Sequence, residues 1–244
     1  MRKKRKNMKS QRRSWPLWAS ASTGLLVVLL ALSLFQAFIA KQYAVSSGSM
    51  ETTLATGDRV VVNRQLGTNY VPTAGDIIVF GATEDWNEQS KSPSRLRGLI
   101  NTFGDLTGIG PSSTNAVVKR IVGVGGDYVE CCSSDGRLIR NSQPIDETYI
   151  YEDYPFVPGA LDCTTTPRSL RCFESIMVPS DSVFVLGDHR SISSDSAYRC
   201  RDSLHSSRSD CARFVRENDI KGRVFATIWP PGHLGIHSQI SSEK

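Results

Sequence analysis

The sequence predicts a mostly β domain that is anchored by one N-terminal transmembrane helix. Short stretches rich in valine, isoleucine and phenylalanine are separated by turn residues, and several of them are entered through Gly-Asp pairs, a pattern typical of β-strands. A charge-free run from residue 15 to residue 40 precedes all of these stretches. We expect strands at residues 58–63, 76–80, 116–124, 127–130, 182–186 and 222–228.

The charge-free run is long enough to cross a bilayer. As a helix rising about 1.5 Å per residue it reaches about 40 Å, whereas the hydrocarbon layer is about 30 Å thick. Residues 1–14 carry eight lysines and arginines, so we expect this basic tail in the cytoplasm and everything after residue 40 on the far side of the membrane. A cleaved signal peptide is the alternative, which we disfavour because no small-x-small cleavage site follows the run cleanly.

The basic tail also accounts for the formal net charge of +5, because the rest of the chain is slightly acidic, and we expect no nucleic-acid partner. We predict an extracytoplasmic domain over residues 41–232 and a polar tail over residues 233–244. An insert at about 81–115 contains apolar residues at helical spacing between Leu96 and Leu106. It forms either a surface flap, which we favour, or a helix that rests its apolar side on the membrane.

All six cysteines fall in the part of the chain that is expected outside the membrane. An even number of cysteines in an oxidising compartment favours disulfides over metal ligation. The intervals 163–172 and 200–211 suit bridges that close local loops, while the adjacent Cys131 and Cys132 cannot be assigned. His205 lies within the second interval, but the spacing fits no common zinc motif, so we expect no metal site.

Two stretches carry the candidate chemistry. Ser49 lies on a Ser-Gly-Ser-Met turn soon after the charge-free run, and Lys119 lies in the apolar stretch VVKRIVGVGGD. A serine nucleophile needs a base, and a lysine can serve only when its amine is neutral, which requires burial to lower its pKa. The neighbouring Arg120 cannot play this part because a guanidinium keeps its charge. From the residues alone two interpretations stay open: a Ser49/Lys119 dyad, or a lysine on an edge strand with its amine in water.

These motifs resemble the bacterial type I signal peptidases, which are membrane-bound Ser/Lys proteases, over roughly residues 15–230. Four boxes appear in the order found in that family, which makes the resemblance more specific than any single motif. They are Ser47-Gly48-Ser49-Met50 through Leu54, Gly57-Asp58 before three valines, Lys119-Arg120 followed by Gly123 and Gly126-Asp127, and Gly187-Asp188-His189-Arg190 leading to Ser193-Ser194-Asp195-Ser196.

The resemblance implies a signal-peptidase-like antiparallel β fold and a role for each matched residue. Ser49 and Lys119 would be catalytic, and no metal or organic cofactor would be needed. The backbone N–H of Ser49 and the hydroxyl of Ser47 would form the oxyanion hole. Ser193 would hydrogen-bond the lysine amine and orient it, and Asp195 would support the local geometry through an ion pair.

Met50 and the valines of the first strand are expected to line substrate pockets, and the surface around Met50 to contact lipid. Two positions depart from the family pattern. Thr52 replaces a common proline, and Ala197 replaces a common arginine, for which Arg199, Arg190 and Arg120 are the candidate substitutes. We do not favour His189 as the base of a Ser/His/Asp triad, and we expect His205, His233 and His237 to be solvated.

The expected function is a serine endopeptidase, signal peptidase I, that cleaves signal peptides from exported preproteins after small residues through an acyl-enzyme. Signal peptides, membrane lipid and the protein-export machinery are the expected partners. One alternative is a catalytically silent paralogue that binds exported peptides or pilin-like subunits for assembly. Another is a self-cleaving Ser/Lys regulator, but that reading needs an N-terminal DNA-binding helix-turn-helix, which residues 1–44 do not provide.

Overall fold

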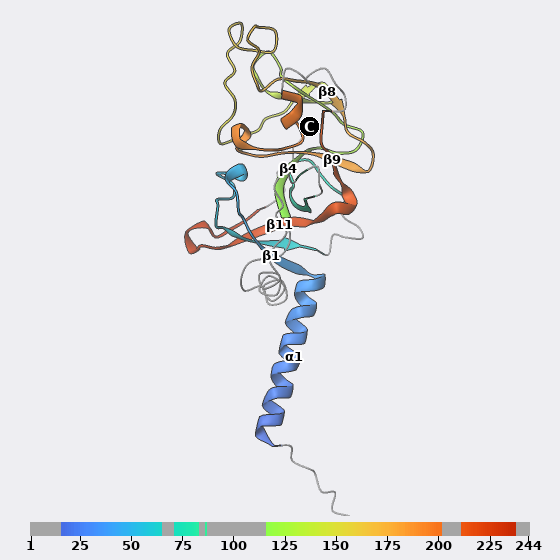
Figure 1. The fold of residues 1–244 in the computed structure, drawn as a ribbon, viewed down its shortest axis with the longest axis vertical. Helices are drawn as coiled ribbons and strands as arrows, with labels where there is room; N and C mark the ends of the chain where they lie inside the picture. Colours follow the sequence, from blue (N-terminus) through green and yellow to red (C-terminus); the bar gives the residue numbers. More distant parts are fainter. Residues whose placement is uncertain (1–15, 65–70, 83–85, 87–115, 202–210, 238–244) are drawn as a thin grey trace, which may run out of the picture.

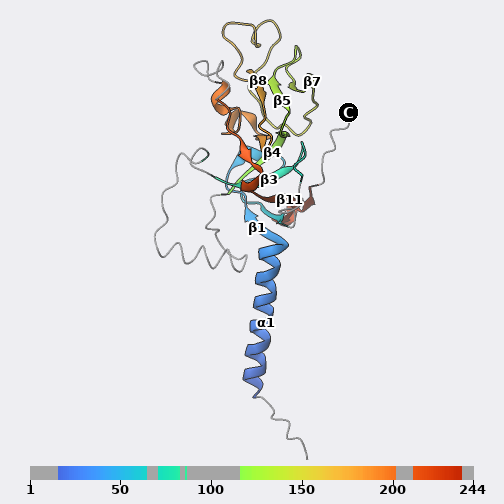
Figure 2. The same ribbon diagram turned by 90° about the vertical axis from the view of Figure 1, so that its right-hand side faces the viewer.

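The computed structural model describes residues 16–64, 71–82, 86, 116–201 and 211–237. Within them, the helix α1 (Leu17–Phe38) has 22 residues and lies inside the charge-free run. It projects from the end of the β domain that carries β1 (Ala40–Ala44), while β5, β7 and β8 lie at the opposite end (Figures 1 and 2). Among the described residues, no helix combines the length and the mean hydropathy that a membrane span requires.

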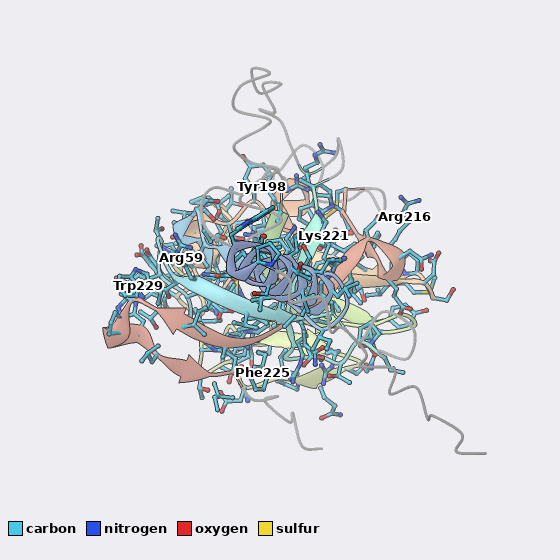
Figure 3. All side chains as sticks on the ribbon, turned by 90° about the horizontal axis from the view of Figure 1, so that it is seen from below. Arg59, Tyr198, Arg216, Lys221, Phe225 and Trp229 are labelled. Atoms are coloured by element: carbon cyan, nitrogen blue, oxygen red, sulfur yellow. A yellow bond between two sulfur atoms is a disulfide. The ribbon has the colours of Figure 1, made fainter. Side chains whose placement is uncertain are left out.

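The larger sheet contains eight of the described strands, in the order β1-β2-β11-β3-β4-β9-β10, with β12 paired to β11. Every ladder between its strands is antiparallel. Viewed from the α1 end, Trp229 of β11 lies beside Arg59 of β2, its partner in the ladder (Figure 3). Besides β1, the strands are β2 (Arg59–Asn63), β3 (Ile77–Gly81), β4 (Ala116–Gly123), β9 (Ser182–Leu186), β10 (Val215–Arg216), β11 (Ile220–Trp229) and β12 (Gly235–Ile236).

The smaller sheet contains four described strands in the order β7-β6-β5-β8, again antiparallel. They are β5 (Tyr128–Cys131), β6 (Leu138–Arg140), β7 (Gln143–Pro144) and β8 (Phe173–Met177). The described single-turn helices are η1 (Gly48–Met50), η4 (Arg190–Ile192), η5 (Tyr198–Arg201), η6 (Glu217–Asp219) and η7 (Pro231–His233). The mostly β, antiparallel architecture predicted from the sequence is therefore confirmed.

Three of the Gly-Asp pairs form the same turn. Gly57, Gly75 and Gly126 have φ angles of 96°, 98° and 90°, a conformation that side chains with a Cβ rarely adopt. The aspartate that follows each glycine accepts a hydrogen bond from the backbone N–H three residues before it, at 2.8 Å for Asp58, 3.3 Å for Asp76 and 2.9 Å for Asp127. This local hydrogen bonding explains why the chain reverses into a strand at each pair.

The strand β4 lies where three hydrophobic clusters meet. Val122 belongs to the cluster that reaches the smaller sheet, Ile121 to a second cluster with Phe80, and Val118 packs against a third around Leu54. A side chain in the middle of β4 is therefore surrounded by packed core. This position decides the environment of Lys119.

The cysteines pair locally. Cys163 and Cys172, and Cys200 and Cys211, come to disulfide-bonding distance, as their intervals predict, and Cys131 pairs with its neighbour Cys132.

The six expected strands are all present, with shifts of one or two residues at their ends, whereas β1, β6, β7, β8, β10 and β12 were not predicted. These strands are short or of mixed composition, so they lack the apolar pattern that marks the others. The tail at 1–14 and, apart from residues 81, 82 and 86, the insert expected at about 81–115 lie outside the described residues.

Candidate active site

Ser49 is held in the single-turn helix η1 by the turn that follows it and by the segment around His189. After η1 the chain turns back, with the Leu54 N–H donating to the Met50 carbonyl at 2.8 Å. The His189 N–H donates to the Ser49 carbonyl at 3.1 Å. The Ser49 residue is only 6% exposed. The nucleophile candidate is therefore fixed by two segments that lie far apart in the sequence.

Lys119 reaches Ser49 from the middle of β4. Its Nζ lies 2.6 Å from the Ser49 Oγ, and the two atoms share a hydrogen bond. The Lys119 residue is 4% exposed, and β4 pairs with β3 on one side and with β9 on the other. The structure thus brings together the serine and the lysine that the sequence singled out.

The surroundings lower the pKa of Lys119 to about 8, from an ordinary value of 10.5. Burial is the largest cause because it removes water from the ammonium form. The Asp195 and Asp188 carboxylates raise the pKa of the lysine, and the Arg213 guanidinium lowers it. A substantial fraction of the amine is consequently neutral near neutral pH.

Ser47 lies on the same turn, and its Oγ is 3.3 Å from the Ser49 Oγ. The hydroxyl of Ser47 therefore stands beside the nucleophile candidate, where a donor to a developing oxyanion is needed. Met50, by contrast, is 1% exposed and packs in the core with Val45 and Leu54. Contrary to the prediction, η1 turns this side chain inward, so Met50 itself offers neither a pocket wall nor a lipid contact here.

The segment after β9 passes directly against the Ser49 turn. At Gly187 there is no room for a Cβ, which would collide with the Ser193 Oγ and lie 2.5 Å from the Ser49 carbonyl oxygen. The hydroxyl of Ser193 is buried and has no hydrogen-bond partner among the described residues. The predicted hydrogen bond from Ser193 to the Lys119 amine is therefore wrong for this structure, because the hydroxyl lies against Gly187.

Asp195 is fully buried, and its ion-pair partner is Arg201. The Arg201 Nη1 donates to the Asp195 Oδ1 at 3.0 Å. None of the three substitutes expected for the arginine missing at Ala197 fills this place. Arg120 pairs with Asp188, Arg190 pairs with Glu147, and Arg199 is exposed. Arg201 was not predicted from the sequence, because its position next to Cys200 indicates a fixed place in the fold but does not indicate which carboxylate it meets.

A second buried ion pair braces the site and was also missed. The Arg120 Nε donates to the Asp188 Oδ1 at 2.8 Å and its Nη2 donates to the Asp188 Oδ2 at 2.5 Å, which is the two-pronged geometry that favours arginine. Thr53 donates to the Asp188 Oδ2 at 2.6 Å, and the Arg120 Nη1 donates to the Gly75 carbonyl at 3.0 Å. This pair ties β4 to the loop after Ser49 and to the Gly187 segment.

The described histidines do not approach Ser49 as a base would. The ring nitrogens of His189 face Glu51 at 3.7 Å and Glu152 at 3.4 Å. His233 is exposed, as expected, and its Nδ1 lies 2.7 Å from the Asp58 Oδ1. His237 was also expected to be solvated, but it is partly buried and its Nε2 lies 2.8 Å from the Thr227 Oγ1. His205 lies outside the described residues.

An open cleft of about 440 Å³ adjoins the Ser49 turn. Its lining includes Glu51, Thr53, Tyr151 and His233. Among the described residues, the cluster with metal-ligand spacing is Cys132, Cys163 and Cys172, whose sulfur atoms lie within 4.8 Å of one another. Each of these sulfur atoms is paired with another cysteine, so the cluster does not offer free thiolates to a metal.

The arrangement has the parts of a nucleophilic hydrolase. A buried amine with a lowered pKa touches a serine hydroxyl, and a second hydroxyl lies beside it. A neutral lysine amine in this place can accept the serine proton. The chemistry that this favours is acyl transfer to Ser49.

Comparisons with known proteins match most of the chain to one family. A family model described as "Signal peptidase, peptidase S26" matches residues 17–229. The "Probable signal peptidase I" of Mycobacterium leprae (strain TN) is 29% identical over 245 residues, which cover 93% of this chain and 81% of that protein. The "Signal peptidase I" of Leptolyngbya laminosa is 30% identical over 222 residues, which cover 90% of this chain and 83% of that protein.

Among solved structures, the signal peptidase I of Enterococcus faecalis V583 matches with 22% sequence identity and a TM-score of 0.32. The match covers 63% of this chain and 96% of that chain.

Proposed function

The chain belongs to the signal peptidase family, peptidase S26, and from this premise we propose that it is a serine endopeptidase that removes N-terminal signal peptides from exported preproteins. The observation that carries the proposal is the buried hydrogen bond between the Lys119 Nζ and the Ser49 Oγ at 2.6 Å. An amine and a hydroxyl at this distance, shielded from water, meet the geometric requirement for general-base activation of a serine.

In the proposed reaction, neutral Lys119 takes the proton of the Ser49 hydroxyl as the Ser49 Oγ attacks the carbonyl carbon of the scissile peptide bond. The resulting ammonium gives that proton to the leaving nitrogen, so the C–N bond breaks and the mature protein departs with a free amino terminus. The signal peptide remains bound to Ser49 as an ester. Lys119 then takes a proton from water as the water oxygen attacks the ester carbon. The ammonium returns this proton to the Ser49 Oγ as the ester C–O bond breaks, which releases the signal peptide with a free carboxylate and restores the serine hydroxyl and the neutral amine.

The negative oxygen formed in each step needs hydrogen-bond donors that are already in place. We assign this task to the Ser49 backbone N–H and to the Ser47 hydroxyl, which stands 3.3 Å from the Ser49 Oγ. Asp195 supports the geometry from behind, because its Oδ2 accepts a hydrogen bond from the Gly187 N–H at 3.3 Å and Gly187 lies against the Ser49 carbonyl.

We also propose that α1 anchors the enzyme in the cell membrane, with the basic tail at 1–14 in the cytoplasm and the peptidase domain outside. Support comes from the charge-free run at 15–40 and from the exposed apolar side chains of α1, which include Leu25, Leu26 and Leu30. Phe225 and Trp229 of β11 are also exposed and offer apolar surface to lipid. In that compartment the three cysteine pairs would be oxidised.

The test is incubation of the detergent-solubilised full chain with a panel of preproteins, followed by N-terminal sequencing of the products. We expect one cut in each cleaved preprotein, after a small residue at the end of its signal peptide. The matched control is the Ser49→Ala variant, which should give no product. Binding of preproteins without any cleavage by the unmodified chain would contradict the proposal and favour a silent, peptide-binding paralogue.

A further inference from the structure

Asp195 is a buried carboxylate that holds the Gly187 backbone, which in turn lies against the Ser49 carbonyl. Its Oδ1 accepts hydrogen bonds from the Arg201 Nη1 at 3.0 Å and from the Ala197 N–H at 3.2 Å, and its Oδ2 accepts one from the Gly187 N–H at 3.3 Å. The side chain of Asp195 is fully buried and that of Arg201 is 6% exposed. A buried carboxylate without a cation is strongly unfavourable, so this pair governs where Asp195 lies.

A second arginine holds the backbone of the same residue. The Arg213 Nη2 donates to the Asp195 carbonyl at 3.0 Å and to the Ser194 Oγ at 2.8 Å, and Arg213 is buried. Its guanidinium also lies 4.7 Å from the centre of the Trp86 ring, within cation–π range. Asp195 is therefore bound by two arginines: Arg201 pairs with its carboxylate, and Arg213 donates to its backbone carbonyl.

Both arginines lie close in the sequence to a cysteine of the Cys200–Cys211 pair. Arg201 directly follows Cys200, and Arg213 comes two residues after Cys211. The Cys200–Cys211 disulfide therefore joins the two chain segments that carry these arginines. Cys200 and Cys211 are buried in the same hydrophobic cluster as Ala197. The small Ala197, which stands where the resembled family commonly has arginine, thus packs in the core, and Arg201 supplies the cation that pairs with Asp195.

We propose that Arg201 and Arg213, fixed by the Cys200–Cys211 disulfide, are a pair of positioning residues that hold Asp195 behind the Ser49 and Lys119 side chains. The inference rests on the proposed peptidase function and deepens it. Arg201 takes the place of the arginine that is missing at position 197. The Cys200–Cys211 disulfide is thereby a working part of the active site and not only a support of the fold.

The electrostatic consequence falls on Lys119. The charged groups that act on its amine are the Asp195 and Asp188 carboxylates, which raise the pKa of Lys119, and the Arg213 guanidinium, which lowers it. Arg120 pairs with Asp188, and Arg201 pairs with Asp195. Removing the Arg201 charge leaves Asp195 less neutralised, so its attraction for the lysine proton grows. The neutral amine then becomes scarcer at a given pH.

The experiment compares the pH dependence of kcat/KM for preprotein cleavage in the full chain and in the Arg201→Met variant. In the unmodified chain, activity should rise with pH through a midpoint near 8, the pKa of Lys119. In Arg201→Met we expect the midpoint about one unit higher and the rate at about pH 7.5 about tenfold lower. Arg201→Lys should keep the midpoint closer to that of the unmodified chain, because the positive charge is retained.

The matched control is Arg199→Met, two residues away on the same turn but exposed, which should leave the profile unchanged. A double Cys200→Ala, Cys211→Ala variant should move the midpoint upward, as Arg201→Met does. A lower rate in Arg201→Met with the midpoint unchanged would overturn the inference, since purely structural damage lowers the rate at every pH alike. Failure of the unmodified chain to cleave any preprotein would instead overturn the proposed function.

Discussion

Replacing Lys119 with methionine is expected to abolish preprotein cleavage while the domain stays folded. The variant removes the base that contacts the Ser49 Oγ, and general-base groups commonly contribute about 10²- to 10⁴-fold to the rate. Methionine is similar in length and apolar, and Lys119 lies in packed core, so the fold loses no favourable exposed charge. We expect kcat/KM to fall by about 10³-fold or more. The midpoint of unfolding should be at least as high as that of the unmodified chain.

Two further variants separate the base from the charge. Lys119→Arg keeps a cation but cannot release a proton near neutral pH, so it should be as inactive as Lys119→Met. Ser49→Ala should be inactive too, and the double variant of Ser49 and Lys119 should lose little more than either single one, because the two groups act as a unit. Cleavage at the unmodified rate in any of these variants would end the dyad assignment.

Replacing Gly187 with alanine is expected to be nearly as damaging, although this residue has no side chain to contribute. The added Cβ would collide with the Ser193 Oγ and lie 2.5 Å from the Ser49 carbonyl oxygen, far closer than van der Waals contact. Either the 187–189 segment or the Ser49 turn must then move. The hydrogen bond from the His189 N–H to the Ser49 carbonyl joins these two segments, so the displacement reaches the nucleophile.

A displacement of about 1 Å at a reacting group can cost about 100-fold in rate, and we expect at least this loss in kcat/KM for Gly187→Ala. Its unfolding midpoint should also fall, because Gly187 lies in packed core. Gly232→Ala is the matched control, since a Cβ there meets no atom within 4 Å. If Gly187→Ala and Gly232→Ala were equally active, the close packing behind Ser49 would not matter for catalysis.

The sequence predicted the parts of the fold and site whose signals are local. The strands β2, β3 and β4 follow from valine- and isoleucine-rich runs. The turns at Gly57, Gly75 and Gly126 follow from the Gly-Asp pairs, in which the glycine takes a positive φ and the aspartate accepts a hydrogen bond from the backbone three residues before it. The contact of Ser49 with Lys119, 70 residues apart, was predicted because the short motif around each residue resembles the signal peptidase family. These features depend on a few neighbouring residues each.

The parts that could not be predicted depend on contacts across the fold. Asp195 draws its cation from Arg201, six residues away, and the choice between this arginine and Arg120 is decided by which of them Asp188 already engages. The burial of Met50 depends on how η1 turns against the core. Pairings of this kind are set by packing in three dimensions, and the order of residues carries little trace of them.

The most direct test of the account is a titration of the Lys119 amine itself, by NMR of the full chain labelled at the lysine ε carbons. The Lys119 signal is identified as the one missing from Lys119→Met. We predict that it titrates near pH 8, which leaves roughly one fifth of the amine neutral at about pH 7.4, against roughly one part in a thousand for an ordinary lysine. A titration near the ordinary value of 10.5 would contradict the account, because an amine charged in this way could not take the proton of Ser49.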